Sequence, residues 1–136
     1  MPIEVTTTAG KTAYASALIG KYETLHVKVD ISALTSKEID AKGLLKPNVP
    51  LSLLGLLLDG VAGEVPCVTV EPIKIPGLND NAAGSIAAII NDPFIACAVN
   101  GVFNRDVAED VLDRTLSPAE IAALNGPNSK IVLSLT

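Results

Sequence analysis

The segment Leu25–Ile31 (LHVKVDI) alternates apolar and polar side chains, and this alternation constrains the fold more than any other feature of the chain. A period of two is typical of a β-strand that buries one face. One face carries Leu25, Val27, Val29 and Ile31, and the other carries His26, Lys28 and Asp30. The segment therefore predicts a half-buried strand, on which His26 is an exposed residue rather than a catalytic base.

Turn-forming residues interrupt the region that follows this strand. They are Gly43, Pro47, Asn48 and Pro50. We expect turns here to separate short strands around Leu44–Leu45 and Leu51–Leu54. Residues 64–76 are expected to be extended, but their apolar residues change parity at Glu71–Pro72. Because proline cannot donate to a strand ladder, the change predicts a bulge or a sheet edge at that point.

Two apolar segments follow a predicted loop over residues 75–85. Residues 86–90 (IAAII) and 94–99 (FIACAV) are joined by the turn-forming sequence NDP and are predicted as buried strands. The first of them is equally compatible with a short helix. The last apolar segment, residues 129–135 (SKIVLSL), predicts a closing strand.

Two short helices are predicted near the C-terminal end. Ser117 can cap a helix that starts at Pro118, and Glu120 lies three residues after the cap, which is the spacing of a capping box. Ile121 and Leu124 supply its apolar face, and Asn125–Gly126 end it. An earlier helix is expected to start at a capping Asp106 and to turn Val107, Val111 and Leu112 inward. The expected class is α/β and β-rich, with a small mixed sheet or partly open barrel-like core and an extended N-terminal arm.

The acidic stretch Asn104–Arg114 could be a metal site, an acid–base site or the solvated face of a helix. Its carboxylates are Asp106, Glu109, Asp110 and Asp113. Acids near a helix N-terminus are favourable, and Arg105–Glu109 and Asp110–Arg114 have ion-pair spacing. We interpret the stretch as the solvated face of a helix, so no metal site and no catalytic residues are predicted there.

Cys67 and Cys97 lie in apolar surroundings and are predicted to be buried, reduced thiols. These cysteines and the single His26 lack the short spacing of zinc ligands. A Gly-Lys-Thr sequence at residues 10–12 resembles part of a phosphate loop, but Val5 stands where that loop needs glycine. No cofactor is therefore expected.

The charge, the aromatic content and the apolar runs of the chain argue against nucleic acids and membranes as partners. The formal net charge is −5 and aromatic residues make up 3% of the chain, which argues against nucleic-acid binding. The longest apolar run, in residues 51–60, is about half of the roughly 20 residues that a membrane-spanning helix needs. The N-terminal sequence shows no secretory pattern, so we expect a soluble protein made in a cytosol.

The segment Val29–Ser52 (VDISALTSKEIDAKGLLKPNVPLS) resembles the entry segment of phage-lambda-type head decoration proteins, also called capsid cement proteins. In that family a strand ending in Asp and a polar stretch lead to a lysine-containing turn, which here is Lys46–Leu51. Asn48 stands where glycine is common, and both residue types tolerate a positive φ. Residues 94–112 and 117–135 are similar to the family's apolar strand, helices and closing strand. The likeness covers about residues 25–136. It departs at residues 60–84, a segment that is longer and richer in proline than we expect for this family.

This resemblance implies a structural protein, not an enzyme, on the outer surface of a phage head. Residues 25–136 would form one core domain, and residues 1–24 a flexible arm that adds a strand to the major capsid protein. The expected capsid-binding residues of the arm are Pro2, Ile3, Glu4, Val5, Thr6, Thr7 and Thr8. The protein would be made in the host bacterial cytoplasm and would sit as homotrimers at local three-fold axes of the expanded shell.

Two other classes of function stay open at this stage. A soluble binding or adhesion module of a bacterial or phage surface assembly would share the fold, but it should show a signal peptide or an aromatic-lined ligand surface. A small enzyme would need a nucleophile and a base in one pocket, and the sequence offers no such pair.

Overall fold

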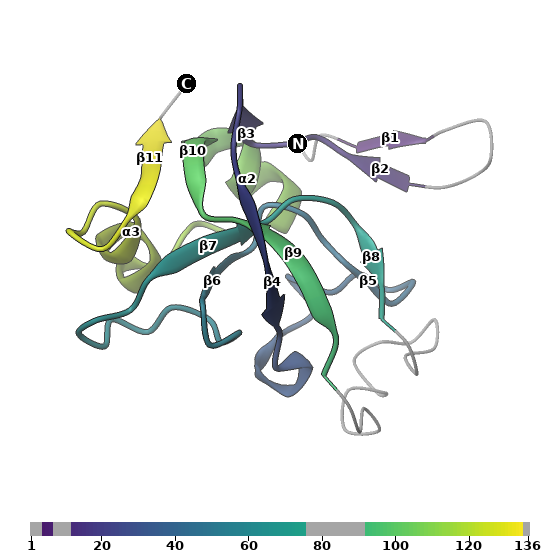
Figure 1. Ribbon diagram of the computed structural model, residues 1–136. Helices are drawn as coiled ribbons and strands as arrows, with labels where there is room; N and C mark the ends of the chain where they lie inside the picture. Colours follow the sequence, from purple (N-terminus) through teal and green to yellow (C-terminus); the bar gives the residue numbers. More distant parts are fainter. Residues whose placement is uncertain (1–3, 7–11, 76–91, 135–136) are drawn as a thin grey trace.

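The computed structural model describes residues 4–6, 12–75 and 92–134. Its strands are β1 (Glu4–Thr6), β2 (Thr12–Tyr14), β3 (Leu18–Ile19), β4 (Thr24–Lys28), β5 (Leu44–Leu45), β6 (Pro50–Ser52), β7 (Pro66–Thr69), β8 (Ile73–Lys74), β9 (Phe94–Ala98), β10 (Asn100–Asn104) and β11 (Lys130–Ser134). Within these ranges the helices are a 3-10 turn, η1 (Ile31–Ala33), and the α-helices α2 (Arg105–Leu112) and α3 (Pro118–Leu124). Figure 1 shows the two α-helices on one side of the strands.

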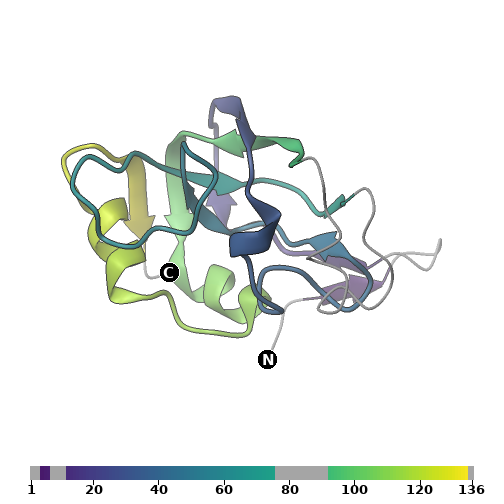
Figure 2. The same ribbon diagram turned by 90° about the horizontal axis from the view of Figure 1, so that it is seen from below.

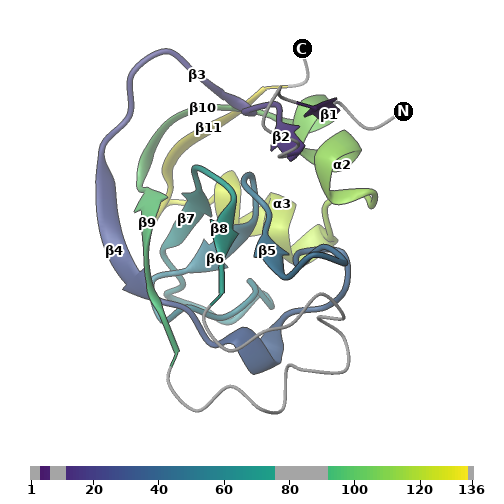
Figure 3. The ribbon, with the colours of Figure 1, turned by 90° about the vertical axis from the view of Figure 1, so that its right-hand side faces the viewer.

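A long, bent antiparallel pair of segments organises the molecule. β4 pairs with β9, and the chain before and after them continues as β3 paired with β10. β9 also belongs to a four-stranded sheet of order β4-β9-β7-β6, while β10 lies between β11 and β3 in a three-stranded sheet. β10 is parallel to β11 and antiparallel to β3, so the three-stranded sheet is mixed, whereas the strand pairs of the four-stranded sheet are antiparallel. Figure 3 shows these strands as one curved wall, which the described strands do not close into a barrel.

The predicted strand Leu25–Ile31 is shorter than expected. β4 ends at Lys28, because the side chain of Asp30 accepts hydrogen bonds from the backbone N–H of Ser32 (3.1 Å) and from its hydroxyl (2.6 Å) and so starts η1. Val27 and Ile31 are buried as predicted, and His26 is exposed as predicted. Leu25 was expected in the core but is 52% exposed. It lies on the edge strand β4, which has a neighbouring strand, β9, on one side only.

The middle of the chain confirms the predicted turns and corrects one strand. β5 lies where it was expected, but β6 ends at Ser52 rather than at residue 54. The N–H of Gly55 donates to the carbonyl of Ser52 (2.9 Å), which places Leu53 and Leu54 in an exposed turn. The parity change at Glu71–Pro72 separates two sheets, since β7 pairs with β6 and β9 whereas β8 pairs with β5.

The C-terminal part follows the predicted order of strand, helix, helix and strand. The capping box of α3 is present, with Glu120 N–H donating to Ser117 Oγ (3.1 Å) and Ser117 N–H donating to Glu120 Oε1 (2.8 Å). The cap of α2 was predicted wrongly, because Asn104 rather than Asp106 accepts the hydrogen bond from Val107 N–H (3.1 Å). Residues 76–90, with most of the predicted loop and the segment 86–90, lie outside the described residues.

The core is aliphatic, as the low aromatic content requires, and Phe103 is its largest fully buried side chain. It begins earlier than predicted, since Ala17 and Leu18 belong to it although the core domain was expected to start at residue 25. Cys67 and Cys97 are free and fully buried, which confirms the prediction of reduced thiols. They lie diagonally on β7 and β9, and the hydrogen bond with Cys97, together with burial, raises the pKa of Cys67.

Candidate functional site

Three of the predicted capsid-binding residues lie in a hairpin that leaves the core. β1 contains Glu4, Val5 and Thr6 and pairs antiparallel with β2, with Val5 opposite Ala13. The other residues predicted for this site, Pro2, Ile3, Thr7 and Thr8, lie outside the described residues. Figure 1 shows the β1–β2 hairpin extending away from the rest of the molecule. Within the described part of the chain, β1 pairs with no strand other than β2, so one of its edges is open.

The arm was predicted to reach residue 24, but the chain is attached to the core from Tyr14 onward. The clearest attachment is Asn48, which is fully buried. Its Oδ1 accepts a hydrogen bond from the N–H of Ala17 (2.9 Å), and its Nδ2 donates to the carbonyl of Ala15 (2.8 Å). The backbone N–H of Asn48 donates to the carbonyl of Thr69 on β7 (2.8 Å). We call these contacts the Asn48 clamp.

The conformation of Asn48 matches its sequence context. Its φ is +70°, in the left-handed region that asparagine and glycine tolerate best. The turn therefore uses the tolerance for a positive φ that asparagine shares with glycine. The side chain has a second role that glycine could not perform, because it supplies partners to two backbone groups of the segment after β2.

Tyr14, the last residue of β2, is fixed by polar contacts on another side. Its hydroxyl donates to Asp40 Oδ2 at 2.6 Å, and Lys46 Nζ lies 5.9 Å from the centre of its ring. Lys46 is itself largely buried and donates to the carbonyl of Val111 near the end of α2 (3.1 Å). Burial lowers the pKa of Lys46, although nearby Asp40 acts in the opposite direction. The hairpin therefore starts from a base fixed to α2 and to the loop before β5.

The chain beyond the clamp joins the sheet. The N–H of Asn104 donates to the carbonyl of Ala17 at 2.7 Å, and Leu18 lies opposite Phe103 in the pairing of β3 with β10. Leu18 is buried, whereas Ile19 on the outer face is 49% exposed. Together with the contacts of Tyr14, these contacts join the segment that follows the β1–β2 hairpin to the core.

The acidic stretch forms a helix surface and the connection that follows it. Arg105 Nε lies 3.1 Å from Glu109 Oε2, which confirms the predicted pair, and the same carboxylate accepts from the N–H of Leu116 (2.8 Å). Asp113 ends α2 in a left-handed conformation and lies 3.1 Å from Lys37 Nζ. In the described ranges, no group of three or more His, Cys, Asp or Glu side chains is arranged to hold a metal ion.

Arg114 makes contacts that its spacing from Asp110 did not predict. Its Nε donates to Glu38 Oε2 (2.9 Å), and its Nη1 and Nη2 donate to the two carboxylate oxygens of Glu120 (2.7 and 3.0 Å). Both carboxylates are almost fully buried. Burial acts to lower the pKa of Arg114, but the hydrogen bonds and charges of Glu120 and Glu38 outweigh it and raise the pKa. We call this group the Arg114 clamp.

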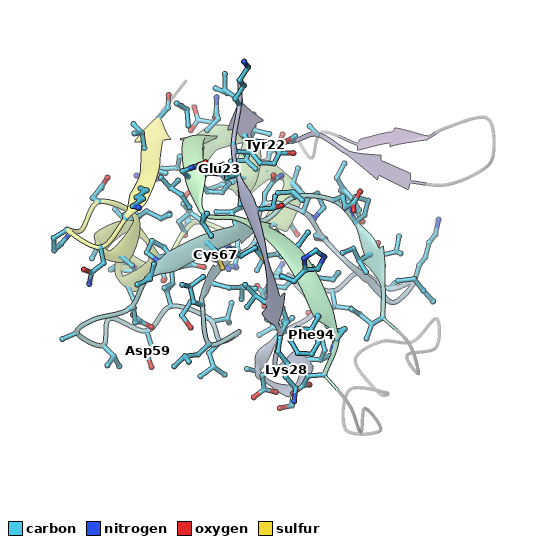
Figure 4. The ribbon with its side chains drawn as sticks, in the orientation of Figure 1. Tyr22, Glu23, Lys28, Asp59, Cys67 and Phe94 are labelled. Carbon is cyan, nitrogen blue, oxygen red and sulfur yellow. The ribbon has the colours of Figure 1, made fainter. Side chains whose placement is uncertain are left out.

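The connection between β6 and β7 carries a group of exposed aliphatic side chains. Its exposed members are Leu53, Leu54, Leu56, Val61 and Val65, which we call the 53–65 surface. It borders an open hollow of about 410 Å³. Glu64 accepts from the N–H groups of Asp59 (3.3 Å) and Gly60 (3.0 Å), so this carboxylate holds the loop. Figure 2 shows the loop beside α3, and Figure 4 places Asp59 at its outer side.

The search for similar proteins returned nothing: no protein-family model, no curated protein and no solved structure matches this chain. Among the described residues, no helix is long and apolar enough to cross a membrane.

Proposed function

We propose that this chain is a head decoration protein that binds the outside of an expanded tailed-phage capsid and stabilises the shell against internal DNA pressure. The observation that carries the proposal is the β1–β2 hairpin, which extends from the core and is fixed at its base. An anchored strand with an open edge is suited to adding itself to a sheet of another protein. The partner in this proposal is the major capsid protein.

Anchoring matters because a decoration protein has to transmit force between subunits of the shell. The Asn48 clamp and the contact of Tyr14 with Asp40 join the base of the hairpin to the core through hydrogen bonds of 2.6–2.9 Å. A load on the hairpin is therefore passed to β7 through Asn48, whose N–H donates to the carbonyl of Thr69. It is passed to α2 by way of Lys46, which lies over the ring of Tyr14 and donates to the carbonyl of Val111. Many copies on one shell would multiply weak individual contacts by avidity.

A trimer requires two different, complementary surfaces on each subunit, since a three-fold ring is built from head-to-tail contacts. Exposed aliphatic side chains of the described residues include two groups that lie apart in the fold. One is the 53–65 surface. The other lies on the three-stranded sheet, where Ile19, Val102 and Val132 are in register across β3, β10 and β11. We propose that the first region of one subunit packs on the second region of the next.

A non-enzymatic role on the outer surface of a virion also fits the chemistry of the described side chains. The carboxylates of Glu38 and Glu120 are both paired with Arg114, and Glu109 is paired with Arg105. The formal net charge of −5 would keep such a protein away from nucleic acid. Ion-paired carboxylates and a negative net charge are both compatible with a structural protein.

Co-sedimentation with capsids tests the proposed function. Purified protein is mixed with expanded, undecorated capsids of its phage and, in parallel, with unexpanded capsids. We expect saturable binding to expanded capsids at one trimer per local three-fold axis, and increased resistance of those capsids to heat. Absence of binding to expanded capsids, or equal binding to both forms, would contradict the proposal.

A further inference from the structure

The sequence Asn-Gly occurs twice in the chain, at residues 100–101 and 125–126. In such a pair the main-chain nitrogen of glycine can reach the side-chain carbonyl carbon of asparagine, because glycine has no Cβ to hinder the approach or to restrict backbone rotation. The structure places the two pairs in opposite environments. One pair lies within a strand and the other lies in the turn that follows a helix.

The pair Asn100–Gly101 is held on several sides. The Oδ1 of Asn100 accepts a hydrogen bond from the N–H of Glu23 (2.7 Å), and its Nδ2 donates to Glu23 Oε1 (2.8 Å). Gly101 lies opposite Ile131 in β10, which is the central strand of the three-stranded sheet. Rotation of the backbone between Asn100 and Gly101 would break these side-chain bonds and part of the strand ladder.

The pair Asn125–Gly126 lies where α3 ends, with Asn125 as the C-cap residue. The side chain of Asn125 is exposed and makes no hydrogen bond among the described residues. The N–H of Gly126 donates to the carbonyl of Ala123 at 3.2 Å. Figure 1 shows the turn between α3 and β11 at the outer side of the molecule. Since the end of a short helix opens more readily than the middle of a sheet, this pair is the freer of the two.

We propose that Asn125 is a site of spontaneous deamidation. The main-chain nitrogen of Gly126 attacks Cγ of Asn125, so a bond from nitrogen to Cγ forms, the bond from Cγ to Nδ2 breaks, and ammonia leaves with the proton of the Gly126 amide. Water then opens the cyclic imide. Opening at Cγ gives aspartate, and opening at the main-chain carbonyl carbon gives isoaspartate. The reaction needs no oxidant or cofactor, and the inference does not depend on the proposed function.

The three other asparagines among the described residues are less suited to this reaction. Asn48 is fully buried, and Asn104 caps α2 with its side chain. Asn128 is exposed, but it precedes Ser129, whose Cβ hinders attack by the main-chain nitrogen. The expected order therefore places Asn125 first.

Both products would weaken the end of α3. A carboxylate at the C-terminal end of a helix faces the negative end of the helix dipole, and the last turn of α3 contains no basic residue that could compensate. Isoaspartate also adds one carbon to the main chain. The turn has little space for it, because a Cβ added at Gly126 would lie 3.1 Å from the carbonyl oxygen of Ala122. The modified turn borders an open hollow of about 290 Å³ that it shares with residues 60–64.

Incubation of the full chain in H₂¹⁸O at alkaline pH, followed by digestion and mass spectrometry, tests this site. A peptide of residues 121–131 in the same solution sets the duration, which ends when its Asn-Gly pair has reacted completely. We expect Asn125 to become aspartate and isoaspartate, each with one ¹⁸O atom, at least about tenfold faster than Asn100 reacts. That ratio corresponds to a difference of about 1.4 kcal/mol in the free energy of local opening. In urea-unfolded protein the two asparagines should react at similar rates.

Two variants locate the reaction and its effect. Asn125→Gln keeps an amide but would need a larger ring, so the label at residue 125 should be lost. Asn125→Asp imitates one product and should lower the melting temperature by about 1–4 °C. Absence of ¹⁸O at Asn125 after the peptide has reacted, or a rate at Asn125 no faster than at Asn100, would overturn the proposed site. An unchanged melting temperature of Asn125→Asp would overturn the proposed effect on α3.

Discussion

The Asn48 clamp and the Arg114 clamp both hold distant segments together through buried polar side chains, but they use different chemistry. Asn48 is a neutral amide that binds backbone groups of Ala15 and Ala17. Arg114 is a cation that binds the carboxylates of Glu38 and Glu120. The first clamp attaches the segment that carries the hairpin, and the second attaches the loop before β5 to helix α3.

This difference in chemistry predicts how much stability is lost when each clamp is removed. Removing one member of a buried ion pair leaves charge without compensation, which is more costly than the net contribution of the pair itself. Removing a buried amide leaves backbone donors and acceptors without partners, at a smaller cost for each group. Damage to the Arg114 clamp should therefore destabilise the whole domain more strongly, whereas damage to the Asn48 clamp should loosen the base of the hairpin.

Arg114→Met is expected to have the largest effect. It leaves Glu38 and Glu120 buried without their cation, so the free energy of unfolding should fall by about 3–5 kcal/mol. Urea denaturation followed by circular dichroism measures this change. The matched control is Arg105→Met, which breaks the more exposed pair with Glu109 and should cost about 1 kcal/mol or less. Similar losses for both variants would mean that burial does not distinguish the two arginines.

Asn48→Ala should come next, with a loss of about 2–4 kcal/mol from two unpaired backbone groups and a strained positive φ. Asn48→Gly removes the same hydrogen bonds but tolerates the positive φ, so it should be less damaging by about 1 kcal/mol. Hydrogen exchange at the Ala17 amide should become faster in both variants. Unchanged exchange at Ala17 would contradict the role of Asn48 as an anchor.

Ser117→Ala tests a contact that belongs to one helix alone. It removes the cap of α3 and should lower the free energy of unfolding by about 1 kcal/mol, measured by thermal denaturation. Binding to expanded capsids should not change, because the capped end of α3 is part of the scaffold. A variant that kept its melting temperature but lost capsid binding would place this helix in the interface instead.

Features set by neighbouring residues could be predicted from the sequence. The capping box at Ser117 and strand β9 depend on residue types within a few positions, and residue 48 is of a type that tolerates the positive φ found there. The cap of α2 was missed, although it is also local, because Asn104 and Asp106 are both good capping residues and the turn geometry chooses between them.

Contacts between distant segments could not be predicted in the same way. The amide of Asn48 bonds with residues 31 and 33 positions away, and Arg114 bonds with Glu38 across 76 positions. Neither the hydrophobic periodicity nor the spacing of charged residues in the sequence indicates partners so far apart. In the candidate site, the strand-forming character of Glu4–Thr6 was expected, but its pairing with Thr12–Tyr14 was not, since those residues show no alternation of their own.

Deletion of residues 2–12 tests most directly whether the hairpin binds the capsid. It also tests whether the anchored core folds without the hairpin. The deletion keeps Tyr14 and the Asn48 clamp, so thermal stability should stay nearly unchanged. Co-sedimentation with expanded capsids should show binding weakened at least about tenfold, which corresponds to about 1.4 kcal/mol per site before avidity. Equal capsid binding by the full-length and truncated proteins would contradict the role proposed for the hairpin.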